Sequence, residues 1–262
     1  MKRPVSLFFG KDQGMVSFLA LLVLITVLLP MIALSPSGRL TLAVFFSLTL
    51  ISGAFTTIRH RIFIGFVIVL TFSTFAFSVL AEFNPRSTSP LLETALKLLC
   101  LSILVSMTVR QTFRPGPVTG YRVMGGIAGY LLIGYTWAYA YQLLIQCVPN
   151  AIHFVAGMTE SPGRQPLHLI YFSFMTLTTV GYGDAYPVLP AARSLAMTES
   201  LVGQLYIAIM IASLVGMALQ GRSDLAAHEE EDSRSAARSF PRTDTAQTKL
   251  STRRKKRRLG TV

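Results

Sequence analysis

The chain has 262 residues, of which 52% are hydrophobic and only 14% are charged, and its formal net charge is +12. This balance excludes an ordinary soluble domain and indicates a protein that crosses a membrane several times. The positive charge does not indicate a nucleic-acid partner, because the Lys and Arg residues lie in predicted loops and in the C-terminal region, where they fit membrane topology.

Six apolar segments are each long enough to cross a bilayer, which takes about 20 residues. Backbone amides in lipid must be paired within their own segment, so we expect helices rather than open strands. The predicted fold class is therefore an all-α membrane protein with six transmembrane helices, at residues 15–34, 40–58, 62–81, 91–109, 122–146 and 191–219.

The distribution of positive charge predicts the orientation of these helices. If residues 1–14 are cytoplasmic, eight Lys and Arg residues before position 220 lie on the inner side and four on the outer side, and eleven more follow on the inner side. The positive-inside rule then predicts a multi-pass protein of the plasma membrane, or of the cytoplasmic membrane in a prokaryote, with both termini inside. The first segment could also be a secretory signal, but its roughly 20 apolar residues favour a retained helix.

The chain divides at residues 110–121, where prolines and positive charges predict a cytoplasmic linker. Residues 15–109 before it form a front domain of four predicted helices. In the fourth of these, Glu93 and Lys97 are four residues apart on one helical face, so they can pair within the membrane. Residues 122–220 form the second predicted domain.

The second domain contains a helix that is too short to cross the membrane. Residues 147–165 are interrupted by Pro and Gly and predict an extracellular loop. Pro166 can open the next helix, and only about 12 residues separate Leu167 from Thr178. A short apolar helix that ends in a glycine-rich stretch is typical of a re-entrant segment.

The glycine-rich segment, residues 178–184, reads Thr-Thr-Val-Gly-Tyr-Gly-Asp. A narrow ring of backbone carbonyls can replace the water shell of K⁺. Successive carbonyls can face one axis only if some residues adopt a positive φ, which Gly181 and Gly183 do cheaply. The C-terminal end of the short helix would add a dipole that favours a cation. The predicted ion-binding residues are Thr178, Thr179, Val180, Gly181, Tyr182 and Gly183, with K⁺ held by the carbonyls of Thr179, Val180, Gly181 and Tyr182 and by the Thr179 hydroxyl.

With this segment, residues 122–219 resemble the outer helix, pore loop and inner helix of the tetrameric potassium-channel family. The motif continues through Asp184 into Tyr186-Pro187, as it does in that family. The resemblance implies a homotetramer of four chains around one pore, passive K⁺ conduction, K⁺ as the permeant ion and no further cofactor. It also implies an inner-helix bending point at Gly203, although close helix packing explains a glycine there equally well.

The residues around this segment depart from the best-known bacterial pattern of the family. In that pattern a Glu bonds the Asp that follows the selectivity filter, which is the glycine-rich segment. Met175 stands at the position of this Glu and cannot form that bond. Tyr171 could reach Asp184 instead, and Phe172 would brace the filter by packing. Glu199, inside the last apolar segment, could support the filter. Alternatively, it could lie near the outer third of the membrane, face water or Arg193 and only tune the local charge.

Six spans with one pore loop also invite comparison with voltage-gated channels. The fourth segment lacks the regularly spaced Arg residues of a voltage sensor, and Glu93 with Lys97 leaves no net charge for a field to move. We therefore predict no steep voltage gating. The front domain resembles a degenerate sensor, and a scaffold or a sensor for lipids or partner proteins remains open. An alternative for the whole chain is a channel-like regulatory subunit that conducts little.

Residues 221–262 are polar and charged and predict a disordered, basic cytoplasmic tail. Its basic cluster could bind anionic lipid headgroups or simply set topology. The cluster consists of Arg253, Arg254, Lys255, Lys256, Arg257 and Arg258.

We predict no enzyme, because His153 and His168 lack metal-ligand spacing and no nucleophile arrangement recurs.

Overall fold

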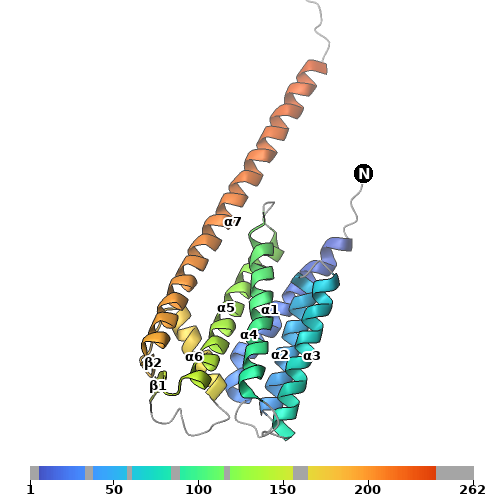
Figure 1. The fold of residues 1–262 in the computed structure, drawn as a ribbon. Helices are drawn as coiled ribbons and strands as arrows, with labels where there is room; N and C mark the ends of the chain where they lie inside the picture. The colour runs from blue at the N-terminus through green and yellow to red at the C-terminus, as the bar shows by residue number, and fades with distance from the viewer. Residues whose placement is uncertain are drawn as a thin grey trace, which may run out of the picture. The chain divides into compact units, whose positions relative to one another are not determined.

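The computed structural model describes residues 6–32, 38–57, 61–83, 89–114, 119–155 and 165–239. Within these ranges the chain is almost entirely helical, with two three-residue strands (Figure 1). The elements in chain order are α1 (Ser6–Ile32), α2 (Gly38–Thr57), α3 (Arg61–Phe83), α4 (Pro90–Thr112), α5 (Gly120–Cys147), β1 (Ile152–Phe154), α6 (Gln165–Leu177), β2 (Ala185–Pro187) and α7 (Pro190–Ser239).

Within the described residues, each of the six predicted apolar segments is helical, and α6 occupies the predicted short segment. Among the described residues, α4 and the Pro190–Leu219 part of α7 are long and apolar enough to cross a membrane. Shorter apolar stretches lie in α1, α2, α3 and α6. The mostly helical fold is confirmed, whereas the count of six spans stays a prediction.

Local sequence signals explain the limits of α4. Pro90 lies in its first turn, where the missing N–H costs nothing, and Ser89 before it has an extended backbone. Glu93 in the first turn and Arg110 in the last turn both complement the helix dipole. The helix ends at Thr112, three residues beyond the predicted limit of 109.

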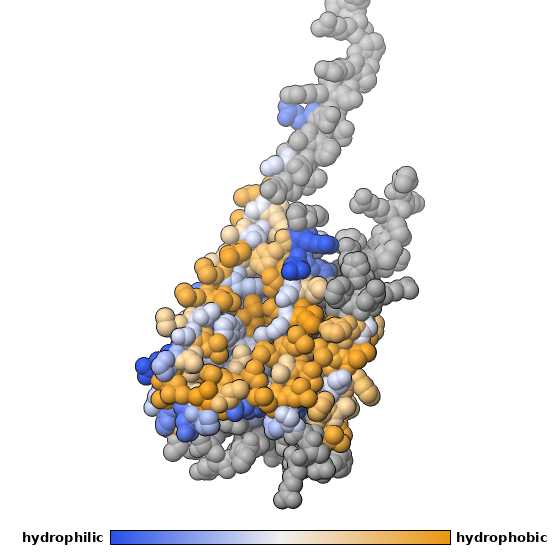
Figure 2. Space-filling view, viewed as in Figure 1, coloured by the Kyte–Doolittle hydropathy of each residue, from blue (hydrophilic) through white to orange (hydrophobic). Residues whose placement is uncertain are grey.

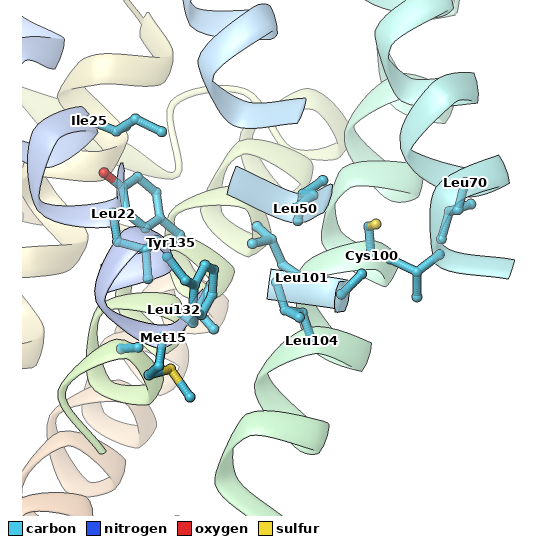
Figure 3. Packing of buried hydrophobic residues seen from close by; sticks show 14 residues of the cluster. Met15, Leu22, Ile25, Leu50, Leu70, Cys100, Leu101, Leu104, Leu132 and Tyr135 are labelled. Carbon is cyan, nitrogen blue, oxygen red and sulfur yellow. The ribbon is translucent and has the colours of Figure 1, made fainter. Parts of the chain in front are cut away.

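One apolar core joins the front helices to α5. It is built from buried side chains of α1 to α5, among them Met15, Leu22, Leu50, Leu101 and Leu132 (Figure 3). The polypeptide up to Met217 forms one compact unit, and the residues from Ala218 onward form a second. The predicted front and pore domains therefore share a core.

The surface of the helical bundle is itself apolar. Figure 2 shows hydrophobic side chains over most of the visible face of the bundle. Large apolar side chains of the bundle are strongly exposed, for example Val69 at 66% and Phe72 at 72%. An apolar surface of this extent fits a lipid environment rather than water.

The prediction of a disordered tail from residue 221 is wrong for residues 221–239, because α7 continues to Ser239. The physical reason lies in the composition of this stretch. Residues 222–239 contain neither Pro nor Gly and are rich in Ala, Glu and Arg, which are helix-forming residues. Residues 240–262, with the basic cluster at 253–258, lie outside the described residues.

Candidate functional site

Helix α6 is a short helix packed along α5 (Figure 1). Its 13 residues span about 20 Å, which is less than the roughly 30 Å of a bilayer core. Leu169 and Phe172 are buried, and the Phe172 ring meets the Tyr141 ring of α5 edge-on with centroids 4.9 Å apart. Phe172 thus packs against the outer helix, and its predicted role in bracing the filter stays a prediction.

The glycine-rich segment is tied to the last turns of α6 by backbone hydrogen bonds. The N–H of Thr178 donates to the Phe174 carbonyl at 3.0 Å, and that of Thr179 to the Thr176 carbonyl at 3.0 Å. The N–H of Gly181 donates to the Met175 carbonyl at 3.2 Å. Because these donors point back at α6, the opposite side of the segment is free to present carbonyl oxygens.

The backbone of this segment alternates in handedness. Thr179, Gly181 and Gly183 have φ values of 60°, 50° and 84°, and the intervening Val180 and Tyr182 are not among the positive-φ residues. When left- and right-handed conformations alternate, the N–H groups of successive residues gather on one side and the carbonyls on the other. An alternating backbone of this kind is suited to presenting a row of carbonyl oxygens along one line.

The sequence indicated Thr179 as a residue whose carbonyl binds the ion but did not predict its positive φ. A β-branched residue at positive φ is a conformational outlier that costs on the order of 1–3 kcal/mol. Residue type carries no signal for it, because Thr normally avoids this region. The hydrogen bonds from Thr179 to Thr176 and from Gly181 to Met175 flank the strained residue and hold it in place.

Gly181 and Gly183 are required by their positive φ angles, and not because a side chain there would collide with neighbouring atoms. A Cβ added to Gly181 or Gly183 would meet no atom within 4 Å. The neighbouring side chains are also open, since Val180 is 50% exposed and Tyr182 is 72% exposed. A single chain therefore leaves this segment uncovered on the side away from α6.

Asp184, at the end of the segment, accepts a hydrogen bond from the Tyr171 hydroxyl of α6 at 2.7 Å. This is the contact that the sequence analysis anticipated in place of a Glu at position 175. Met175 contributes to the segment through its backbone carbonyl instead. The structure thus brings Tyr171, Met175 and Asp184 together around the segment.

A two-stranded antiparallel sheet, which the sequence analysis did not predict, fixes the chain after Asp184. Strand β1 pairs with β2 so that His153 lies opposite Tyr186. The N–H of Val155 donates to the Asp184 carbonyl at 2.9 Å. Strands of three residues are too short for an alternating pattern, so periodicity could not reveal them.

Glu199 of α7 is fully buried, with 0% of its side chain exposed. It accepts a hydrogen bond from the Tyr141 hydroxyl of α5 at 2.6 Å, and its other carboxyl oxygen lies 2.5 Å from Ser173 Oγ of α6. The alternative that Glu199 faces water or Arg193 is wrong. The Arg193 Nε–H points to the Pro187 carbonyl at 3.4 Å.

Ser173 and Tyr141 are site residues that sequence reasoning missed. They lie 26 and 58 positions from Glu199. Hydroxyl side chains are frequent in this chain, so nothing in their local sequence distinguishes these two. Only the packing of α5, α6 and α7 brings the three groups together.

Gly203 lies where α7 passes the end of α6. A Cβ at this position would be 2.5 Å from the Leu177 carbonyl oxygen. Close packing therefore accounts for this glycine, and α7 is helical through it. The bending role of Gly203 stays a prediction.

The two histidines noted in the sequence do not form a metal site. His153 lies on β1 and stacks on Tyr186 with ring centroids 4.9 Å apart, and His168 lies on α6. Among the residues that the structure describes, no group of three His, Cys, Asp or Glu side chains could hold a metal ion.

Residues 129–220 match the model of a protein family described as ion channel. The match covers roughly a third of the chain and includes most of α5, all of α6, the glycine-rich segment and the apolar part of α7. This part of the protein is an ion-channel pore domain, and the family that it matches transports ions across membranes and is not a family of enzymes. No curated protein and no solved structure matches the chain.

Proposed function

We propose that four copies of this chain form a K⁺-selective pore that conducts passively. The carbonyls of Thr179, Val180, Gly181 and Tyr182, with the Thr179 hydroxyl, replace the water shell of the ion. The observation that carries this proposal is the alternation of positive φ at Thr179, Gly181 and Gly183, a backbone pattern that favours carbonyls facing one side.

The proposed tetramer follows from the need for a closed ring of carbonyl oxygens around the ion. One chain contributes one strand of carbonyls, whereas a dehydrated ion must be surrounded, and four strands around an axis complete the shell. The exposed side chains of Val180 and Tyr182 fit this assembly, because neighbouring subunits would cover them. Apolar side chains exposed at four-residue intervals along α7 provide further surface for subunits or lipid: Met197, Leu201, Leu205 and Ile209.

The surroundings of the segment suit a filter that must keep its shape. Tyr171 holds Asp184 beyond its outer end, and the Met175 carbonyl holds Gly181 in its middle. The C-terminal end of α6, at Leu177, immediately precedes the segment and presents the negative end of the helix dipole to a cation.

We further propose that the channel is not steeply voltage-gated. Lys97 forms an ion pair with Glu93 at 2.6 Å, and Ser78 of α3 donates to the same carboxylate oxygen. The Lys97 ammonium also lies 5.9 Å from the centre of the Tyr139 ring of α5. A charge paired within its own helix contributes little net charge to a moving sensor.

The test is ion flux into liposomes that contain the purified protein. We expect K⁺ flux well above Na⁺ flux, with block by Ba²⁺, and loss of selective flux in Gly181→Ala because Ala at φ 50° is strained. Gly65→Ala of α3 is the matched control, since a Cβ there also meets nothing within 4 Å but no positive φ is involved.

Two results would overturn the proposal. Nonselective or Ba²⁺-insensitive flux in the unchanged protein would refute K⁺ selectivity, and normal flux in Gly181→Ala would refute the assigned filter. Recording conductance over a wide range of positive and negative voltages tests gating. A steep sigmoid dependence would refute the proposal for the front helices.

A further inference from the structure

Three helices meet at Glu199 through a chain of oxygen atoms. The Tyr141 hydroxyl of α5 lies 2.6 Å from one carboxyl oxygen of Glu199, and Ser173 Oγ of α6 lies 2.5 Å from the other. The same Ser173 Oγ lies 2.7 Å from the carbonyl oxygen of Gly134 on α5. Each of these three contacts is as short as a good O–H···O hydrogen bond.

Three such contacts need three hydrogen atoms. Tyr141 and Ser173 supply one each, and the Gly134 carbonyl supplies none. If Glu199 were ionised, Ser173 could donate to the carboxylate or to Gly134 but not to both, and one pair of acceptor oxygens would face each other without a hydrogen. A proton on Glu199 supplies the third hydrogen atom.

We propose that Glu199 is kept as a neutral carboxylic acid that donates its proton to Ser173. Tyr141 then donates to Glu199, Glu199 donates to Ser173, and Ser173 donates to the Gly134 carbonyl. Every oxygen of the chain is satisfied, and the bonds run in one direction from α5 through α7 and α6 back to α5.

The surroundings support the neutral form. Glu199 and Ser173 are both 0% exposed, and the Tyr141 side chain is fully buried as well. In the described part of the chain, no Lys or Arg forms an ion pair with Glu199. An isolated buried carboxylate would be strongly unfavourable, whereas a neutral acid with two hydrogen-bond partners is not.

This acid also positions the proposed filter, an inference that rests on the proposed function. Ser173 lies on α6 two residues before Met175, whose carbonyl accepts the Gly181 N–H. A bond that fixes Ser173 fixes the rotation of α6 about its axis, and with it the direction of the Met175 carbonyl. Glu199 is thus a positioning residue that acts on Gly181 through α6.

Infrared spectroscopy of the purified protein at neutral pH tests the protonation state without any measurement of transport. We expect the carbonyl stretch of a protonated carboxylic acid in the unchanged protein and its disappearance in Glu199→Gln. Thr198→Ala is the matched control, because Thr198 is the adjacent residue and its hydroxyl bonds only its own helix at Ser194. A spectrum identical in the unchanged protein and Glu199→Gln would overturn the neutral acid.

Ion selectivity tests the positioning role. Glu199→Gln keeps a neutral group that accepts from Tyr141 and donates to Ser173, so we expect its K⁺ over Na⁺ permeability ratio to stay near that of the unchanged protein. Glu199→Ala removes both bonds, and we expect the ratio to fall about tenfold or more. A normal ratio in Glu199→Ala would overturn the positioning role.

The two variants separate this proposal from folding and from the proposed function. If Glu199→Gln remains helical by circular dichroism but loses selectivity, a charged carboxylate is required and the neutral acid is refuted. If Glu199→Ala does not fold, the Gln variant and the infrared spectrum still decide the question. A nonselective unchanged protein would refute the proposed function, whereas the infrared result would stand by itself.

Discussion

Two regions of the molecule place hydroxyl groups in apolar surroundings but use them differently. They are the front helices, α1 to α4, and the pore segment, which comprises α5, α6, the glycine-rich segment and α7 up to Leu219. In α1, α2, α3 and α4 most of the hydrogen-bonded Ser and Thr side chains donate to the carbonyl four residues earlier in their own helix. These are Thr26, Thr56, Thr71, Ser102, Ser106, Thr108 and Thr112. In the pore segment, Thr136 and Thr198 also bond their own helix, whereas other hydroxyl groups bond groups outside theirs, among them Tyr141, Tyr171, Ser173 and Tyr206.

This difference shows how each region acquires its geometry. A hydroxyl that bonds its own helix is satisfied, but it places no constraint on the neighbouring helix. The front helices therefore rely mainly on apolar packing, which tolerates substitutions that keep volume and shape. Among their described residues, few hydroxyl groups bond another helix, as Ser78 does to Glu93 and Thr26 does to Tyr135. The pore segment uses directional bonds between helices, which hold the carbonyl row in one arrangement.

Gly203→Ala should produce the largest loss of stability in the pore segment. The new Cβ would lie 2.5 Å from the Leu177 carbonyl oxygen, a backbone atom that cannot move aside cheaply. We expect a loss of about 3 kcal/mol, the upper end of the usual range for overpacking. Thermal unfolding of the purified protein measures it, with Gly216→Ala of α7 as control, since that Cβ meets nothing within 4 Å. Equal stability of the two variants would contradict close packing at Gly203.

Tyr141→Phe removes one donor to the buried Glu199, so we expect a loss of about 1–3 kcal/mol in unfolding free energy. Tyr135→Phe on the same helix is the matched control. The partner of Tyr135 is Thr26, whose hydroxyl also bonds the Leu22 carbonyl at 2.7 Å and so stays satisfied. If Tyr135→Phe lowers the unfolding free energy more than Tyr141→Phe does, the proposed difference between the front helices and the pore segment is refuted.

Tyr171→Phe removes the bond to Asp184 and should affect transport more than stability. A hydrogen bond of this kind is worth about 1 kcal/mol, so we expect the K⁺ over Na⁺ permeability ratio to fall about fivefold. Met175→Leu should leave the ratio unchanged, because the contact of Met175 with the segment is made by its backbone carbonyl. An unchanged ratio in Tyr171→Phe would show that Asp184 is held by other groups.

Thr108→Val should have the smallest effect. Thr108 is buried in α4, but its hydroxyl bonds the Leu104 carbonyl of the same helix at 2.8 Å, and Val has nearly the same shape. We expect the unfolding free energy to change by no more than about 0.5 kcal/mol. A loss comparable to that of Tyr141→Phe would mean that front-helix hydroxyls also fix the packing between helices.

The region after residue 221 shows where a prediction from local composition was wrong. High charge suggested disorder after residue 221, yet residues 222–239 have the helix-forming residues to continue α7. Likewise, Thr has no preference for positive φ, so Thr179 could not be predicted. Strands β1 and β2 were missed because each has only three residues.

The sequence by itself determined the helical segments and the glycine-rich segment between the last two of them. Apolar length and the conformational freedom of Gly181 and Gly183 are local properties, so they can be read along the chain. The sequence also indicated Tyr171 as a substitute partner for Asp184, where Met175 stands in place of a Glu, and the structure contains that hydrogen bond.

The tertiary structure alone decided what Glu199 does. Its partners come from α5 and α6, far away in the sequence, and many other hydroxyl groups were equally available by residue type. Which of them reaches a buried carboxyl group depends on how three helices pack, and hydrogen-bond geometry is set by that packing within fractions of an ångström.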